Sequence, residues 1–130
     1  APNLLKVADH FRNSLYDLDT HCHKEEQVLY PYIMEMWRAH DLGQQVEAFH
    51  CGSIQGPIQV MMADHDDELA RHARIAELTN NYTAPAEADE DWREVLGLLR
   101  DFRAALEEHT AMENEVVFPM SLKLEQLAVG

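Results

Sequence analysis

Apolar residues recur in alternating steps of four and three along three long stretches of the sequence, which is the spacing of one face of an α-helix. The stretches predict helices over residues 3–39, 57–81 and 89–127, and no strand-like alternation of useful length occurs between them. Gly and Pro punctuate the two connections. The predicted fold class is all-α, an up-down bundle of long helices forming one domain over residues 1–130. The apolar face of the first helix contains Leu4, Ala8, Phe11, Leu15, Leu18, Cys22, Leu29, Tyr32 and Met36.

The composition excludes several classes of partner. The chain has 24 Asp and Glu against 10 Lys and Arg, a formal net charge of −14. This charge repels phosphate backbones and anionic lipid, so we expect neither nucleic acid nor a membrane surface as a partner. No apolar run approaches the roughly 18 residues of a spanning helix, and no secretory leader is visible. Cys22 and Cys51 form neither a CxxC motif nor a disulfide framework, which favours a reducing, cytoplasmic setting.

An eleven-residue pattern occurs twice, each time where an apolar face is interrupted by polar residues. Residues 21–31 read HCHKEEQVLYP, and residues 109–119 read HTAMENEVVFP. Both consist of His, three residues, Glu, two residues, Val, an aliphatic residue, an aromatic residue and Pro. In a helix, His and Glu four residues apart lie on one face with Cβ atoms about 5–6 Å apart, so both reach one metal or a close pair. One such pair is usually a surface pair, but two matching copies predict a metal site.

Glu25 and Glu113 both take places where the apolar face calls for an apolar residue. Burial of one unpaired carboxylate costs several kcal/mol, and two that face each other repel, so cations between them resolve the conflict. Oxygen and imidazole ligands without thiolates suit iron or manganese better than a structural zinc. A carboxylate can also bridge two metals, so two bridging glutamates would imply a site with two metals rather than one. His65, in MMADHDDE, is the third contribution, and one of Asp64, Asp66 and Asp67 is expected to orient its ring.

Three other residues on these helices are expected to have structural roles. His72 lies one heptad from His65, about 10 Å along the helix axis, too far to share its metal, so it is expected to pack or to meet water. Pro31 and Pro119 end the two copies of the pattern and predict a kink or the end of a regular stretch.

The stretches HKEEQVLYP, GPIQVMMADHDDE, ELTNNYT and HTAMENEVVFP together resemble the hemerythrin-like domain of the iron–sulphur cluster repair di-iron proteins, the RIC family. The resemblance covers nearly the whole chain and implies a four-helix bundle with a non-haem di-iron centre. It implies two iron ions, oxo- or hydroxo-bridged, with Glu25 and Glu113 as bridging ligands and with His21, His65 and His109 as terminal ligands. It also implies that this chain supplies three of the four helices. The family's first helix, with two further histidine ligands, and its small cysteine-bearing domain are then expected outside this sequence.

The resemblance predicts a stress-response protein that supplies iron to iron–sulphur proteins whose clusters nitric oxide or oxidants have damaged. The alternative is a hemerythrin-type module that binds or senses dioxygen or nitric oxide, for which a stable reversible adduct would be the discriminating observation. A redox enzyme is a third and less favoured function. Ferritin-like sites use Glu-x-x-His pairs, and the one match, Glu47 to His50, lies in a connection. An apolar groove left by an absent first helix predicts self-association as a homodimer.

Overall fold

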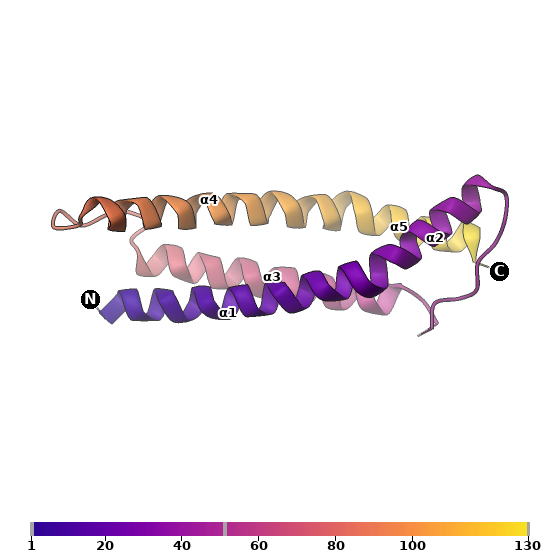
Figure 1. Cartoon of the computed structure of the whole chain (residues 1–130), viewed down its shortest axis with the longest axis horizontal. Coiled ribbons are helices and arrows are strands. Elements are labelled where there is room, and N and C mark those ends of the chain that lie inside the picture. Colours follow the sequence, from indigo (N-terminus) through magenta and orange to yellow (C-terminus); the bar gives the residue numbers. More distant parts are fainter. Residues whose placement is uncertain (1, 51, 130) are drawn as a thin grey trace. The chain divides into compact units, whose positions relative to one another are not determined.

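The computed structural model describes residues 2–50 and 52–129 and confirms the all-α fold class. Within these residues no strand is formed, and a single isolated bridge joins Val46 to Val129. No described helix is both long and apolar enough to cross a membrane. Figure 1 shows α1 continuing through η1 into α2, and α4 continuing through η2 into α5. The elements are α1 (Pro2–Lys24), η1 (Glu25–Leu29), α2 (Tyr30–Asp41), α3 (Gln55–Leu78), α4 (Glu90–Met112), η2 (Glu113–Val117) and α5 (Phe118–Ala128).

Local side-chain chemistry sets the ends of the helices within a few residues of the predicted positions. At the start of α4, the Asp89 carboxylate accepts a hydrogen bond of 2.8 Å from the N–H of Trp92, as an N-cap residue does. After α3, the Thr79 hydroxyl accepts a hydrogen bond from the N–H of Tyr82. Asn80 follows with a φ of +50°, in the left-handed region that Asn tolerates better than most residues. The predicted second helix therefore ends three residues early, at Leu78.

The two short elements η1 and η2 are π-helical segments inside otherwise continuous helices, where the sequence predicted kinks. Pro31 and Pro119 lie in the first turns of α2 and α5. Proline has no N–H, and its ring clashes with the carbonyl four residues earlier, so the regular ladder cannot pass through it. Instead, the hydrogen bonds just before each proline span five residues. The N–H of Tyr30 donates to the carbonyl of Glu25, and in η2 the residue before Pro119 donates to the carbonyl of Glu113 in the same way.

The chain divides into two compact units, and the larger part of the predicted metal site belongs to unit 2, which comprises Leu18–Asp64 and Ala111–Gly130. In this unit α2 lies against α5 (Figure 1). The Glu125 carboxylate accepts a hydrogen bond of 2.8 Å from the N–H of Ile54, just before α3 begins. The core of the unit anchors both π-helical segments through residues of the repeated pattern. Its buried members are Leu29, Met36, Phe49, Ile54, Ile58, Met61, Phe118, Leu124 and Ala128.

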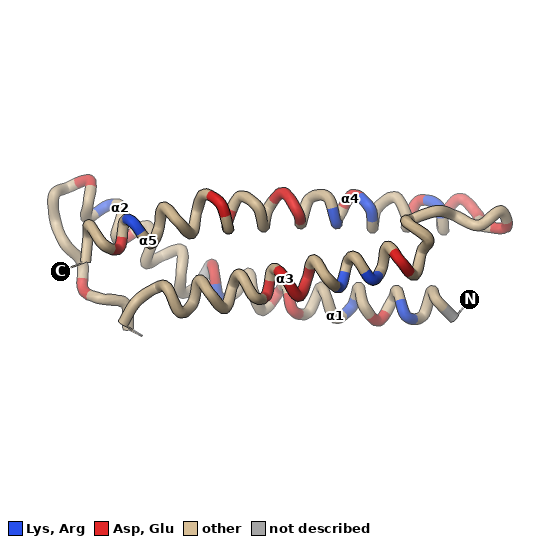
Figure 2. Tube along the Cα trace, turned by 180° about the vertical axis from the view of Figure 1, so that it is seen from behind, with Lys and Arg blue, Asp and Glu red and all other residues tan. Residues whose placement is uncertain are grey.

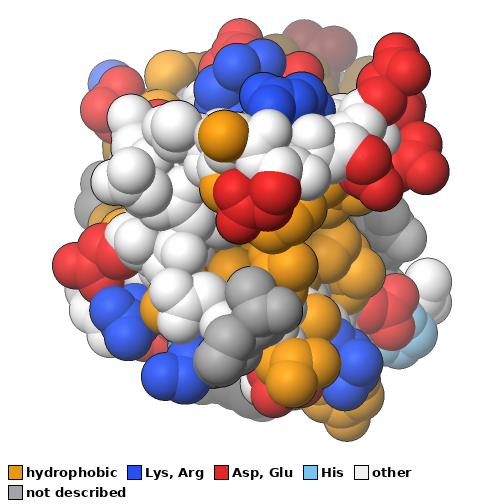
Figure 3. All heavy atoms as spheres, turned by 90° about the vertical axis from the view of Figure 1, so that its left-hand side faces the viewer, with side chains coloured by type: hydrophobic (Ala, Val, Ile, Leu, Met, Phe, Trp, Pro, Cys, Tyr) orange, Lys and Arg blue, Asp and Glu red, His pale blue; other side chains and the backbone are white. Residues whose placement is uncertain are grey.

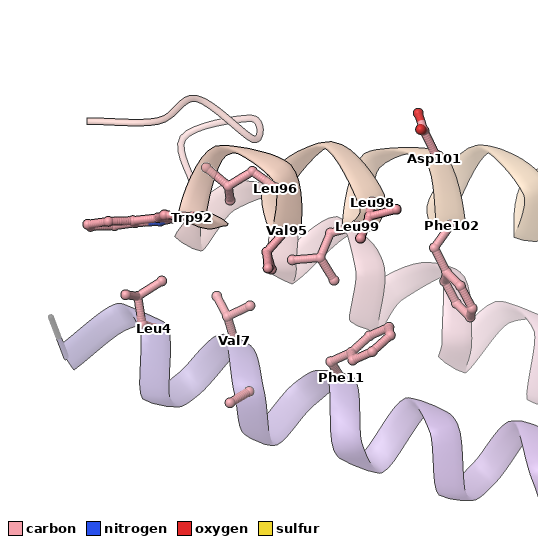
Figure 4. A pocket seen from close by; sticks show the side chains of 11 residues that line it. Leu4, Val7, Phe11, Trp92, Val95, Leu96, Leu98, Leu99, Asp101 and Phe102 are labelled. Carbon is pink, nitrogen blue, oxygen red and sulfur yellow. The ribbon is translucent and has the colours of Figure 1, made fainter. Parts of the chain in front are cut away.

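Unit 1 comprises Ala1–Asp17 and His65–Thr110, and its apolar side chains are incompletely covered. Its small core is built around Val7, Ile75 and Leu99. A groove of about 700 Å³ runs beside this core, and Figure 4 shows side chains of α1 facing those of α4 across it. Val95 lines the groove and remains 53% exposed. Figure 3 shows hydrophobic side chains gathered in a band among charged ones on this face.

The buried face of α1 is not the one that the apolar spacing predicted. Leu15 is 48% exposed and Cys22 is also exposed, while Cys51 lies outside the described residues. The buried positions are instead Val7, Ser14 and His21, which follow one another at heptad spacing. Two of these three side chains are polar, and both have buried polar partners. The apolar spacing therefore predicted the wrong side of α1, because it left these buried polar residues out of account. Figure 2 shows acidic residues along α1, α3 and α4.

Candidate metal centre

Three of the five predicted metal ligands come together in a buried group within unit 2. His21 at the end of α1, Glu25 at the start of η1 and Glu113 at the start of η2 belong to unit 2 and are 4%, 3% and 3% exposed. His65, 2% exposed, is the residue that follows Asp64 on α3. Each of the three residues of unit 2 offers a nitrogen or oxygen atom, and these three atoms all lie within 4.8 Å of one another.

The donor atoms of this group fit a cation. Glu25 Oε1 lies 2.5 Å from His21 Nε2. Burial of a charged carboxylate costs free energy unless it is paired, and a cation bound by both atoms removes that cost. The donors of the group are one imidazole and two carboxylates without a thiolate, a set that suits iron or manganese. These residues therefore fit the metal that the repeated pattern predicts.

Asp64 lies beside His21 within unit 2. Asp64 Oδ2 lies 3.3 Å from His21 Nδ1, so it is placed to accept the proton of the ring nitrogen that faces away from Glu25. Burial lowers the pKa of His21, but the contacts with Glu25 and Asp64 and the charge of Glu113 outweigh burial and raise it. Metal-binding histidines commonly donate their second N–H to a carboxylate, which fixes the ring. Asp64 is therefore placed to orient His21, while the orientation of the His65 ring by Asp64, Asp66 or Asp67 stays a prediction.

Tyr30 is the residue of the site that the sequence analysis missed. Its hydroxyl donates a short hydrogen bond to Glu113 Oε2 within unit 2. Burial raises the pKa of Tyr30, and the hydrogen bond to Glu113 and the charges of Glu113 and Glu25 raise it further, so the hydroxyl stays protonated. The only signal in the sequence was an aromatic residue at the tenth place of the repeated pattern. It indicated an aromatic ring common to the two copies and did not indicate a hydrogen-bond donor.

His109 is not part of the buried group. It is exposed in the last turn of α4, four residues before Glu113. Its role as a ligand rests on its place in the repeated pattern and stays a prediction.

His72 belongs to a second buried polar cluster, in unit 1, and is completely buried there. The Ser14 hydroxyl donates a hydrogen bond of 2.6 Å to Glu68 and lies 2.9 Å from His72 Nε2. Arg71 pairs with Glu68 and with Asp17, at 2.8 Å each. Burial raises the pKa of Glu68, although Ser14 and Arg71 oppose this. Burial, and then two nearby arginine charges, lower the pKa of His72 to about 4, so its ring is neutral.

Similarity to known proteins identifies the family. Residues 1–121 match the model of the hemerythrin HHE cation-binding domain. The chain belongs to this hemerythrin HHE family. The buried His21, Glu25 and Glu113 of unit 2 lie within the residues that this model matches.

Curated relatives carry the name iron–sulfur cluster repair protein YtfE. The protein from Musicola paradisiaca is 35% identical over 111 residues, which are 85% of this chain and 44% of that protein. The proteins from Citrobacter koseri and Escherichia coli O1:K1 are 35% and 34% identical over 106 residues, 82% of this chain and 42% of each relative. The chain therefore spans less than half the length of the curated relatives that it matches.

Proposed function

We propose that this hemerythrin-like domain belongs to a non-haem di-iron protein that supplies iron for the repair of iron–sulphur clusters damaged by nitric oxide or oxidative stress. The observation that carries the proposal is the buried group of His21, Glu25 and Glu113 within unit 2. Relatives with about 35% identity are named iron–sulfur cluster repair proteins, which supports the choice of cargo and acceptor.

In this proposal the glutamates hold the iron by their charge, and the histidines are the ligands that an acceptor protein replaces. Glu25 and Glu113 would supply the two negative charges that hold ferrous iron. His21, His65 and His109 would be the neutral ligands. Neutral ligands are the ones that donor atoms of an acceptor protein displace most readily. The thiolates that hold iron–sulphur clusters are soft, strong ligands, so iron passes from this oxygen- and nitrogen-rich site to them.

The experiment compares two glutamates of the same short segment. Glu113→Gln changes the buried carboxylate, whereas Glu115→Gln changes an exposed one two residues away in η2 and serves as the matched control. Each protein is loaded anaerobically with ferrous iron, its iron content is measured, and it is added to an iron–sulphur enzyme inactivated by nitric oxide.

Wild type and Glu115→Gln are expected to bind iron and restore the activity of the damaged enzyme. Glu113→Gln is expected to lose iron binding and repair together, because a neutral amide replaces one of the two charged ligands. Full repair by Glu113→Gln would refute the proposal. A stable, reversible dioxygen adduct of the wild type with no iron transfer would also refute it, in favour of a carrier or sensor.

A further inference from the structure

The two copies of the repeated pattern differ chemically at their tenth position. The first copy has Tyr30 there and the second has Phe118. Both residues close a π-helical segment through their backbone N–H groups, which donate to the carbonyls of Glu25 and Glu113, so their backbones do the same work. Phe118 is 1% exposed in the core of unit 2 and has no polar atom in its side chain. The two halves of the site therefore match in backbone and differ by one hydroxyl group.

That hydroxyl crosses from one copy of the pattern to the other. Tyr30 belongs to the copy that carries Glu25, but its hydroxyl donates to the carboxylate of Glu113. A phenolic hydroxyl has a single proton, so it can donate to one carboxylate at a time. A hydrogen bond of this kind to a charged carboxylate is among the stronger ones in proteins and fixes the orientation of the acceptor.

We propose that Tyr30 is a positioning residue of the metal centre, which holds the carboxylate of Glu113 in the orientation in which it binds metal. The inference rests on the proposed metal-binding function of this group. Partners that hydrogen-bond to metal ligands typically contribute about 10- to 100-fold to metal affinity. Without the hydroxyl, the Glu113 carboxylate is free to turn, so iron is expected to leave the site faster.

The test removes the hydroxyl and nothing else. Tyr30→Phe makes the first copy of the pattern equal to the second at this position. Tyr32→Phe is the matched control, because Tyr32 lies two residues away in the same unit and donates instead to the carbonyl of Glu47, at 2.6 Å. Both variants are loaded with two equivalents of ferrous iron, and release to an excess of a chelator is followed by absorbance, with far-UV circular dichroism as the check of folding.

Wild type and Tyr32→Phe are expected to release iron at the same rate. In Tyr30→Phe the release is expected to be about tenfold or more faster, while the helical signal is preserved. Release at the wild-type rate in Tyr30→Phe would overturn the inference and leave the metal site standing. Equal acceleration in Tyr32→Phe would also overturn it. Absence of bound iron in the wild type would overturn the proposed function itself.

Discussion

The buried histidine of unit 1 makes a quantitative prediction about stability and pH. His72 is fully buried, stacks on Phe102 with ring centroids 5.2 Å apart, and stays neutral because burial lowers the pKa of its ring to about 4. In the unfolded chain the same histidine titrates near 6.5. Below pH 6.5 the unfolded state therefore takes up a proton that the folded state does not.

The sign and size of the effect follow from this difference. Above pH 6.5 His72 contributes no pH dependence, since the ring is neutral in both states. Between pH 6.5 and about pH 4 the free energy of unfolding falls with falling pH by about 1.4 kcal/mol for each pH unit. By pH 4 the loss amounts to about 3 kcal/mol, a large fraction of the stability of a domain of this size.

The assay is urea denaturation of the metal-free protein at pH 7, 5.5 and 4, with His72→Phe as the test variant. Phenylalanine keeps a planar ring against Phe102 but cannot take up a proton. All other titrating groups are shared, so the difference in free energy of unfolding between variant and wild type isolates His72. This difference is expected to shift by about 3 kcal/mol in favour of the variant between pH 7 and pH 4. His40→Phe, at an exposed histidine of α2, is the control. A difference for His72→Phe that stays constant with pH would refute the reasoning.

Two further predictions concern stability at neutral pH. Ser14→Ala is expected to cost about 1–3 kcal/mol, because it removes the 2.6 Å hydrogen bond to the buried carboxylate of Glu68; denaturation beside Asn13→Ala, an exposed neighbour, measures it, and equal effects would count against the cluster. Leu29→Ala, at a residue 1% exposed, is expected to cost about 2–5 kcal/mol, whereas Leu15→Ala, at a residue 48% exposed, is expected to cost less than about 1 kcal/mol. Equal losses in thermal melts of these two leucine variants would contradict the observed buried face.

The positions of the helices could be predicted from the sequence because strong local signals mark them. Pro57 lies in the first part of α3, which begins two residues earlier than predicted, and Asp89 caps α4. The buried face of α1 was less predictable. Ser14 and His21 are buried there through polar partners from distant parts of the sequence, and no count of apolar residues can find such partners.

The candidate site could likewise be predicted only in part from the sequence. The His-to-Glu spacing predicted that His21 and Glu25 lie close together, because four residues along a helix bring side chains onto one face. Tyr30 could not be found in this way. Its hydroxyl reaches the glutamate of the other copy of the pattern, 83 residues away in sequence, through a tertiary contact that periodicity does not encode.

The most direct test of the central claim is to locate iron in crystals of the iron-loaded domain by anomalous diffraction at the iron absorption edge. The account predicts two peaks about 3.5–4 Å apart, with the carboxylates of Glu25 and Glu113 reaching both ions and with His21 and His65 among the other ligands. Iron bound only at other residues, or no iron beside Glu25 and Glu113, would contradict it.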